Sequence, residues 1–116
     1  VKLASRKKEI LRIISIQSDS VFLELVDDGL IDNDSVSVFI NNKVLLNKIA
    51  LSDKALKQII YLPNTNEGII ITMFAENEGS IPPNTGLLIL RDGEIKYEIR
   101  FSSNKNKSAA VELQRK

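Results

Sequence analysis

The stretch RDGEIKYEIRF at residues 91–101 decides the fold class of this chain. After Asp92-Gly93, charged and apolar residues alternate strictly through residue 101. Successive side chains of a β-strand point to opposite faces, so this alternation predicts a strand whose apolar side chains face a core. An Asp-Gly pair between two apolar runs is a strong signal for a tight β-hairpin, with residues 87–90 as the strand before the turn.

The same period of two extends outward from this hairpin. Alternating apolar residues predict further strands at 20–25, 35–40, 69–76 and 109–113. Both faces of residues 69–76 are largely apolar, which predicts a central position in a sheet. Apolar runs at 44–51 and 59–62 predict two more strands, and Asn41-Asn42-Lys43 is typical of a hairpin turn. We therefore expect an all-β fold, an antiparallel β-sandwich of about eight to nine strands.

Two segments are less clear. Residues 10–17, ILRIISIQ, match both helical spacing and an isoleucine-rich strand, and we favour the strand because the run is short. Residues 52–60, SDKALKQII, predict one short helix that Ser52 caps. The basic start of the chain predicts a flexible N-terminal tail at residues 1–9 and a single β-sandwich domain at residues 10–116.

The composition excludes several kinds of chemistry. The chain contains no His and no Cys, so the usual zinc, copper and iron–sulfur sites and the Ser–His–Asp and Cys–His nucleophiles are not available to it. A net charge of +1 gives no bulk attraction to nucleic acid or to an anionic membrane. We expect a protein that is not an enzyme and that does not bind nucleic acid.

No apolar stretch reaches the roughly 18 residues that a membrane-spanning helix needs, so we expect no membrane insertion. The chain begins at Val1 and not at Met, which leads us to expect that a targeting segment has been removed upstream.

Three segments carry a resemblance to a known group. Residues 27–45, DDGLIDNDSVSVFINNKVL, resemble the pattern D-N-G-x-I-D-G-D-T-V-S-V-Y-x-N-x-K of a small secreted domain of Bacteroidetes-type envelope proteins. Residues 75–90, AENEGSIPPNTGLLIL, are similar to that group's A-E-N-L-G-x-I-P-P-N-T-A-L-M, and residues 97–113 to its final hairpin. The departures from the patterns are Asn33, Glu78 and Gly86, where Gly, Leu and Ala are preferred.

This resemblance covers about residues 10–113. It implies a β-sandwich in the periplasm or outside the cell, and it implies no activity and no site residues.

An acidic cluster raises the possibility of a calcium site. Its members are Asp27, Asp28, Asp32, Asn33 and Asp34. Calcium takes six to eight oxygen ligands of this kind, but the spacing is not that of the calcium-binding helix–loop–helix. Asp, Asn and Gly are also the residues that ordinary turns use, and we favour that reading. Calcium is the only cofactor that the sequence suggests.

A second candidate site is Glu76, Asn77 and Glu78, beside the loop that contains Pro82 and Pro83. Loops on a rigid β scaffold often bind ligands, although this loop equally suits a rigid crossover between two sheets. Glu76 and a loop acid form the one conceivable carboxylate pair for hydrolysis, and nothing in the sequence selects it.

Other motifs are weaker. Arg6–Lys8 and Lys105–Lys107 are basic patches that we expect to be solvated ends and loop tips. Asp19-Ser20-Val21 and Asp34-Ser35-Val36 match the Asp-Ser/Thr-aliphatic motif of protein O-glycosylation in the group that the chain resembles.

From these observations we expect a non-catalytic extracytoplasmic module, periplasmic or extracellular, that contacts a protein or a glycan in the cell envelope. Two alternatives remain open. One is a calcium-dependent binding or adhesion domain that uses the Asp27–Asp34 loop, and the other is a carboxylate-based hydrolase.

Overall fold

The structure is a computed structural model that describes residues 6–27, 35–62, 68–76 and 84–115. These residues form nine strands and no helix. The strands are β1 (Lys7–Ile16), β2 (Ser20–Asp27), β3 (Ser35–Ile40), β4 (Lys43–Ala50), β5 (Leu56–Tyr61), β6 (Ile69–Ala75), β7 (Asn84–Asp92), β8 (Ile95–Ser103) and β9 (Lys107–Arg115). The expected all-β fold is confirmed.

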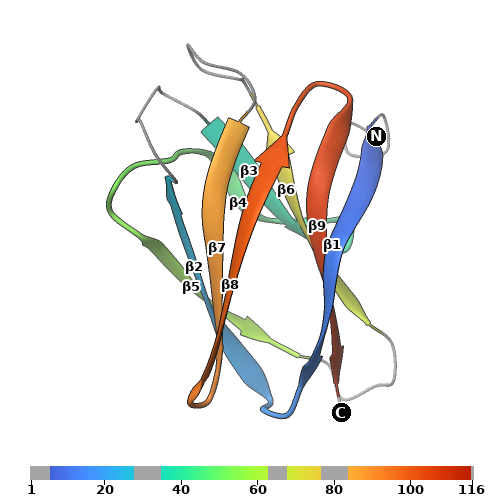
Figure 1. Cartoon of the computed structure of the whole chain (residues 1–116), viewed down its shortest axis with the longest axis vertical. Helices are drawn as coiled ribbons and strands as arrows, with labels where there is room; N and C mark the ends of the chain where they lie inside the picture. Colours follow the sequence, from blue (N-terminus) through green and yellow to red (C-terminus); the bar gives the residue numbers. More distant parts are fainter. Residues whose placement is uncertain (1–5, 28–34, 63–67, 77–83, 116) are drawn as a thin grey trace.

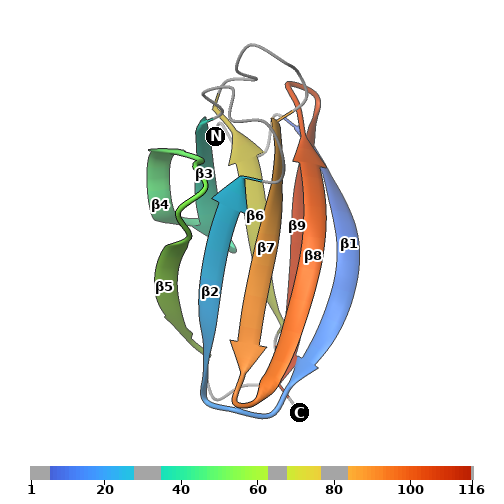
Figure 2. The same cartoon turned by 60° about the vertical axis from the view of Figure 1, so that its left-hand side comes forward.

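The strands form two stacked sheets (Figure 1). The first has the order β1-β9-β6-β3-β4 and the second the order β5-β2-β7-β8. All neighbouring strands are antiparallel except β1 and β9, which run parallel. The edge strands β4 and β5 lie at one side of the sandwich and β1 at the other (Figure 2).

The core lies between the sheets and follows the alternation of the sequence. Val21, Leu23 and Leu25 of β2 are at most 1% exposed. The apolar side chains of β6 and β9 that face them across the core are at most 4% exposed, as expected for the central strands of a sandwich. In β8 the prediction is confirmed for Ile99 and Phe101, which are buried, whereas Ile95 at the start of the strand is 45% exposed.

The helix expected at residues 52–60 is wrong. Residues 56–61 form β5, which pairs with β2 in an unbroken antiparallel register. The side chains of β5 alternate between the core and solvent, with Ile60 buried and Tyr61 exposed. A short isolated helix is marginal in water, so tertiary pairing with β2 overrides the helical propensity of Ala55 and Lys57.

Both predicted hairpin turns are confirmed. Asn41 and Asn42 connect β3 to β4, and Asn41 has a φ of 54°, in the left-handed region that Asn tolerates. Gly93 and Glu94 connect β7 to β8, and Gly93 has a φ of 61°. At the N-terminal end, β1 begins at Lys7, so residues 7–9 belong to the sheet and not to a tail.

Asp92 joins the β7–β8 hairpin to the turn between β1 and β2. It is only 3% exposed, and its two carboxylate oxygens accept hydrogen bonds from the backbone N–H groups of Gln17 and Ser18 at 2.9 and 3.0 Å. Burial raises the pKa of Asp92, but the hydrogen bonds from the Ser18 side chain and the two backbone groups outweigh it. The pKa of Asp92 in the folded protein is therefore below its ordinary value of 3.8.

Because its folded-state pKa is lowered, Asp92 stabilises the fold above pH about 4, and this contribution is lost as the pH falls further. We expect Asp92→Asn to lower the free energy of unfolding at pH 7 by about 1–3 kcal/mol, since one of the two N–H groups loses its acceptor. The variant should also lose less stability than wild type between pH about 5 and 2. Urea unfolding across this range tests both effects, with the exposed Asp53→Asn as control. An unchanged pH dependence in Asp92→Asn would contradict this role.

Gly86 lies opposite Phe101 in the β7–β8 pair. A Cβ at Gly86 would lie 2.6 Å from Cζ of the Phe101 ring and 3.1 Å from the carbonyl oxygen of Val26. The ring therefore covers the space that a side chain would take.

We expect Gly86→Ala to lower the free energy of unfolding by about 1–3 kcal/mol, because the buried ring has to move. Phe101→Leu should also destabilise the protein, since it leaves space in the core. In the double variant the two losses should partly cancel, which a double-mutant cycle of thermal or urea unfolding measures. Strictly additive losses would show that the ring does not occupy the site of the alanine methyl group.

Candidate functional site

A group of exposed apolar side chains that share hollows lies around Tyr61, where the edges of the two sheets meet. Tyr61 is 76% exposed, Val44 is 54% exposed and Phe22 is 53% exposed, and Ile59 is also exposed. We define the Tyr61 surface as Phe22, Ile40, Lys43, Val44, Lys57, Ile59 and Tyr61.

Three hollows adjoin Tyr61. One of about 420 Å³ separates it from the β3–β4 turn and Ile69. A second of about 520 Å³ lies over the outer face of β2 and β5, beside Phe22 and Ile59. The third, of about 370 Å³, lies between β4 and β5. Each has the volume of a small ligand-binding pocket, about 300–1,000 Å³, and all are open to solvent.

Strand geometry explains why these side chains gather here. In β5 the period of two that buries Ile60 directs Ile59 and Tyr61 outward. In β2 the same alternation exposes Phe22, which lies opposite Ile59 in the register. Cross-strand neighbours on one face are close enough to form a continuous apolar surface.

The edge strand β4 contributes to the surface through an irregular backbone. Its pairing with β3 shifts twice, between Val36 and Val38 and between Val38 and Phe39. Lys48 next to these shifts has a φ of 48°. The extra residues break the alternation, so both Leu45 and Leu46 are partly buried against the core while Val44 is exposed.

Two lysines, Lys43 and Lys57, border the hollows around Tyr61, and no carboxylate lines these hollows among the described residues. Residues 43–61 contain four lysines, at positions 43, 48, 54 and 57, and one acidic residue, Asp53. On the outer face of β2, Glu24 lies opposite Lys57, and its side chain accepts a hydrogen bond from Nε of Arg91 at 2.7 Å. This bond and the charges of Arg91, Lys57 and Lys96 outweigh burial and hold the pKa of Glu24 below 4.5. The acidic side chain opposite Lys57 is thus already paired with an arginine.

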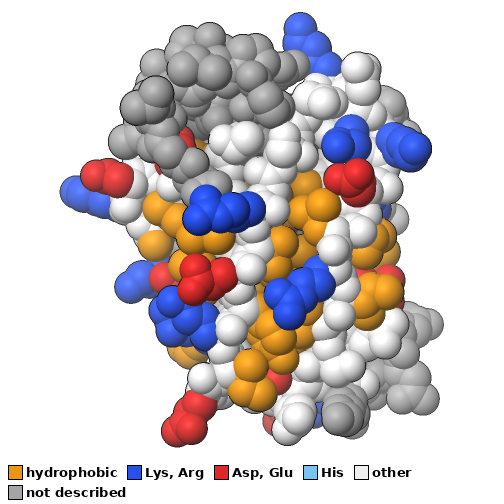
Figure 3. Space-filling model, in the orientation of Figure 1, with side chains coloured by type: hydrophobic (Ala, Val, Ile, Leu, Met, Phe, Trp, Pro, Cys, Tyr) orange, Lys and Arg blue, Asp and Glu red, His pale blue; other side chains and the backbone are white. Residues whose placement is uncertain are grey.

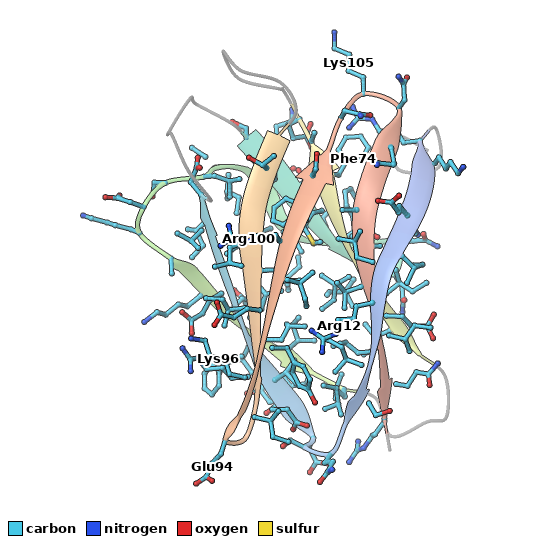
Figure 4. The ribbon with its side chains drawn as sticks, viewed as in Figure 1. Arg12, Phe74, Glu94, Lys96, Arg100 and Lys105 are labelled. Atoms are coloured by element: carbon cyan, nitrogen blue, oxygen red, sulfur yellow. The ribbon has the colours of Figure 1, made fainter. Side chains whose placement is uncertain are left out.

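On the opposite side of the sandwich, side chains of β1 and β8 span the gap between the sheets, while Ile10, Leu11 and Ile13 of β1 are exposed. Arg12 of β1 extends over the ring of Tyr97 in β8, at 5.4 Å from the ring centroid, and Figure 4 shows it in the gap between β8 and β1. Ser103 at the end of β8 donates a hydrogen bond to the Met73 carbonyl oxygen at 2.8 Å and accepts one from the Ala109 N–H at 3.0 Å. Figure 3 shows apolar side chains along this gap, with charged side chains scattered over and around them.

Of the predicted binding residues, Glu76 is part of the internal structure. Its carboxylate accepts a hydrogen bond from the hydroxyl of buried Ser37 at 2.5 Å, and its N–H donates to the Ser35 carbonyl oxygen at 2.9 Å. The Ser37 hydroxyl also accepts the N–H of Lys48, the residue with positive φ. Asn77 and Glu78 lie outside the described residues.

The calcium prediction stays a prediction. The backbone N–H of Asp27 donates to the Ser52 carbonyl oxygen at 2.9 Å. Asp28, Asp32, Asn33 and Asp34 lie outside the described residues. Within the part of the chain that the structure describes, no three carboxylates, His or Cys form a group suited to a metal.

Arg6 is not the solvated basic end that the sequence predicts. Its guanidinium lies 3.7 Å from the centroid of the Phe74 ring, and its Nη1 donates to the Ala75 carbonyl oxygen at 2.6 Å. Phe74 in turn packs edge-on against Phe39. Of the two possible O-glycosylation sites, Ser20 begins β2 and Ser35 begins β3, and neither motif is tested.

A comparison with protein-family models, curated proteins and solved structures found no match for this chain. The resemblance to secreted Bacteroidetes-type domains therefore stays a prediction. None of the residues that the structure describes belongs to a helix long and apolar enough to cross a membrane.

A substitution of Ser37 tests whether its hydroxyl holds the Glu76 carboxylate in place. We expect Ser37→Ala to lower the free energy of unfolding by about 1–3 kcal/mol, because it leaves the Lys48 N–H and one Glu76 oxygen without this partner. Ser15→Ala, at an exposed position of β1, should change stability by less than about 0.5 kcal/mol. Equal stability of the two variants, measured by urea unfolding, would show that Glu76 is not held by Ser37.

Proposed function

We propose that this chain is a non-catalytic binding module of the cell envelope that contacts a protein or a glycan through the Tyr61 surface. The observation that carries the proposal is the exposure of Tyr61, Val44 and Phe22 around shared hollows. Isolated exposed apolar residues are common on any protein, whereas adjoining ones around a hollow are typical of an interaction site. The envelope location rests on the resemblance of residues 27–45 and 75–90.

The character of the side chains supports binding over catalysis. Aromatic residues are enriched at the centres of interfaces, where they bury a large area at a low entropic cost. Among the described residues that form the Tyr61 surface there is no carboxylate, and the charged members are Lys43 and Lys57. Without His the chain lacks the most frequent general base, and without Cys it lacks one common nucleophile.

A test needs variants that change the Tyr61 surface without unfolding the protein. Tyr61→Ser and Val44→Ser suit this purpose, because both side chains are more than half exposed and their loss should change stability by less than about 1 kcal/mol. The matched control is Ile13→Ser on β1, at the opposite edge of the same sheet as Val44, where Ile13 is 60% exposed.

The wild-type protein is screened against a display library of random ten-residue peptides and against a glycan array. We expect the ligands found in this way to bind Tyr61→Ser and Val44→Ser at least about tenfold more weakly than they bind wild type. Ile13→Ser should bind them like wild type. Thermal unfolding of each variant verifies the fold. The proposal fails if neither collection yields a ligand, or if the ligands bind both surface variants with wild-type affinity.

A further inference from the structure

The backbone of β5 offers a binding edge of its own. The N–H of Leu62 donates to the carbonyl oxygen of Asp19 at 2.9 Å, directly beyond the paired residues of β5 and β2. In an antiparallel ladder every second residue bonds to the neighbouring strand. Ile60 and Gln58 therefore direct their backbone groups to β2, whereas Tyr61, Ile59 and Lys57 direct theirs away from it. Because β5 is the last strand of its sheet, these groups face the open edge.

The other three sheet edges among the described strands are modified in ways that hinder strand addition. The register of β1 shifts between Ile10 and Arg12, and that of β4 shifts twice. β8 is held against the first sheet by Ser103 and is covered by Arg12 at Tyr97. Bulges and covering contacts are the usual means by which natural sheets block their edges. β5 has no such bulge, since its register with β2 is regular from Leu56 to Tyr61.

We propose that an extended acidic segment of a partner protein adds to the free edge of β5 as a further strand. The inference rests on the proposed function of the Tyr61 surface and names the class of its partner. Strand addition uses main-chain hydrogen bonds for affinity and alternate side chains for specificity. Here every second side chain of the segment would enter the hollow between β4 and β5, which Ile40, Val44 and Leu45 line together with β5. Apolar side chains match that lining.

Charge selects an acidic partner. Lys43 and Lys57 border the hollows around Tyr61, no carboxylate lines these hollows among the described residues, and Glu24 opposite Lys57 is bonded to Arg91. A second copy of this chain would bring its own lysines to the same edge, so self-pairing of two β5 edges is opposed by like charge. Acidic side chains on the partner strand would instead lie beside Lys57 and Lys43. The same lysines thus disfavour a homodimer and favour an acidic segment.

The experiment uses ten-residue peptides selected from the random library, and wild-type protein as reference. We expect selected peptides to alternate acidic and apolar residues. Their affinity should fall at least about tenfold in the double variant Lys43→Glu/Lys57→Gln. Glutamine is used at position 57 because a glutamate there would face Glu24. Lys105→Glu, on the loop that Figure 4 shows at the top of the molecule, is the charge-reversal control and should leave binding unchanged.

The backbone contribution is measured with N-methylated peptides. Methylating the alternate amides that face β5 should weaken binding at least about tenfold, whereas methylating the amides of the other register should not. Two results would overturn this inference and leave the proposed function standing. In the first, the peptides bind wild type and not Tyr61→Ser, but they are not acidic. In the second, the peptides keep their affinity with either methylation pattern. Glycans as the only ligands, or concentration-dependent dimers of wild type that Tyr61→Ser abolishes, would also overturn it. Ligands that bind Tyr61→Ser and Val44→Ser normally would overturn both proposals.

Discussion

Two stacked sheets leave the gap between them open along two sides. The side chains at those two sides determine where the apolar core reaches solvent. On the side of β1 and β8, the Arg12 side chain covers Tyr97, and Ser103 connects the end of β8 to β6 and β9. On the side of β4 and β5, no comparable contact is found among the described residues. The core therefore continues outward into the partly buried Leu45 and the exposed Tyr61. On this side the apolar surface continues into the hollows around Tyr61.

The alternation of apolar residues was sufficient to predict most of the fold. It identified the strands that became β2, β3, β6, β8 and β9, because each has one face in the core and each is long enough to show the period. It failed at residues 52–60, where good helix formers such as Ala55 and Lys57 precede a strand of six residues. No local pattern could reveal that β2 needs a partner on this side. The strand order and the parallel pairing of β1 with β9 likewise depend on contacts between distant segments.

The candidate surface was harder to predict than the fold. The sequence directed attention to Asp27–Asp34 and to Glu76, since carboxylates and turn residues are conspicuous. Glu76 instead bonds to Ser37, a contact between residues 39 positions apart. Tyr61, Val44 and Phe22 read only as strand residues, and their exposure follows from edges and bulges that no single segment encodes. The available signal was slight: residues 59–61 place two apolar side chains on the face that alternation assigns to solvent.

The parallel pairing of β1 and β9 has a mechanical consequence. Since the two strands run in the same direction side by side, the chain enters β1 at one end of the molecule and leaves β9 at the other (Figure 1). Tension applied between Lys7 and Arg115 would act along both strands and would load their shared hydrogen bonds together, in shear. Bonds loaded in this way resist force collectively, whereas a hairpin pulled at its two ends opens one pair at a time. A pull along the length of the molecule would therefore load the β1–β9 pair, while the β5 edge lies at the side.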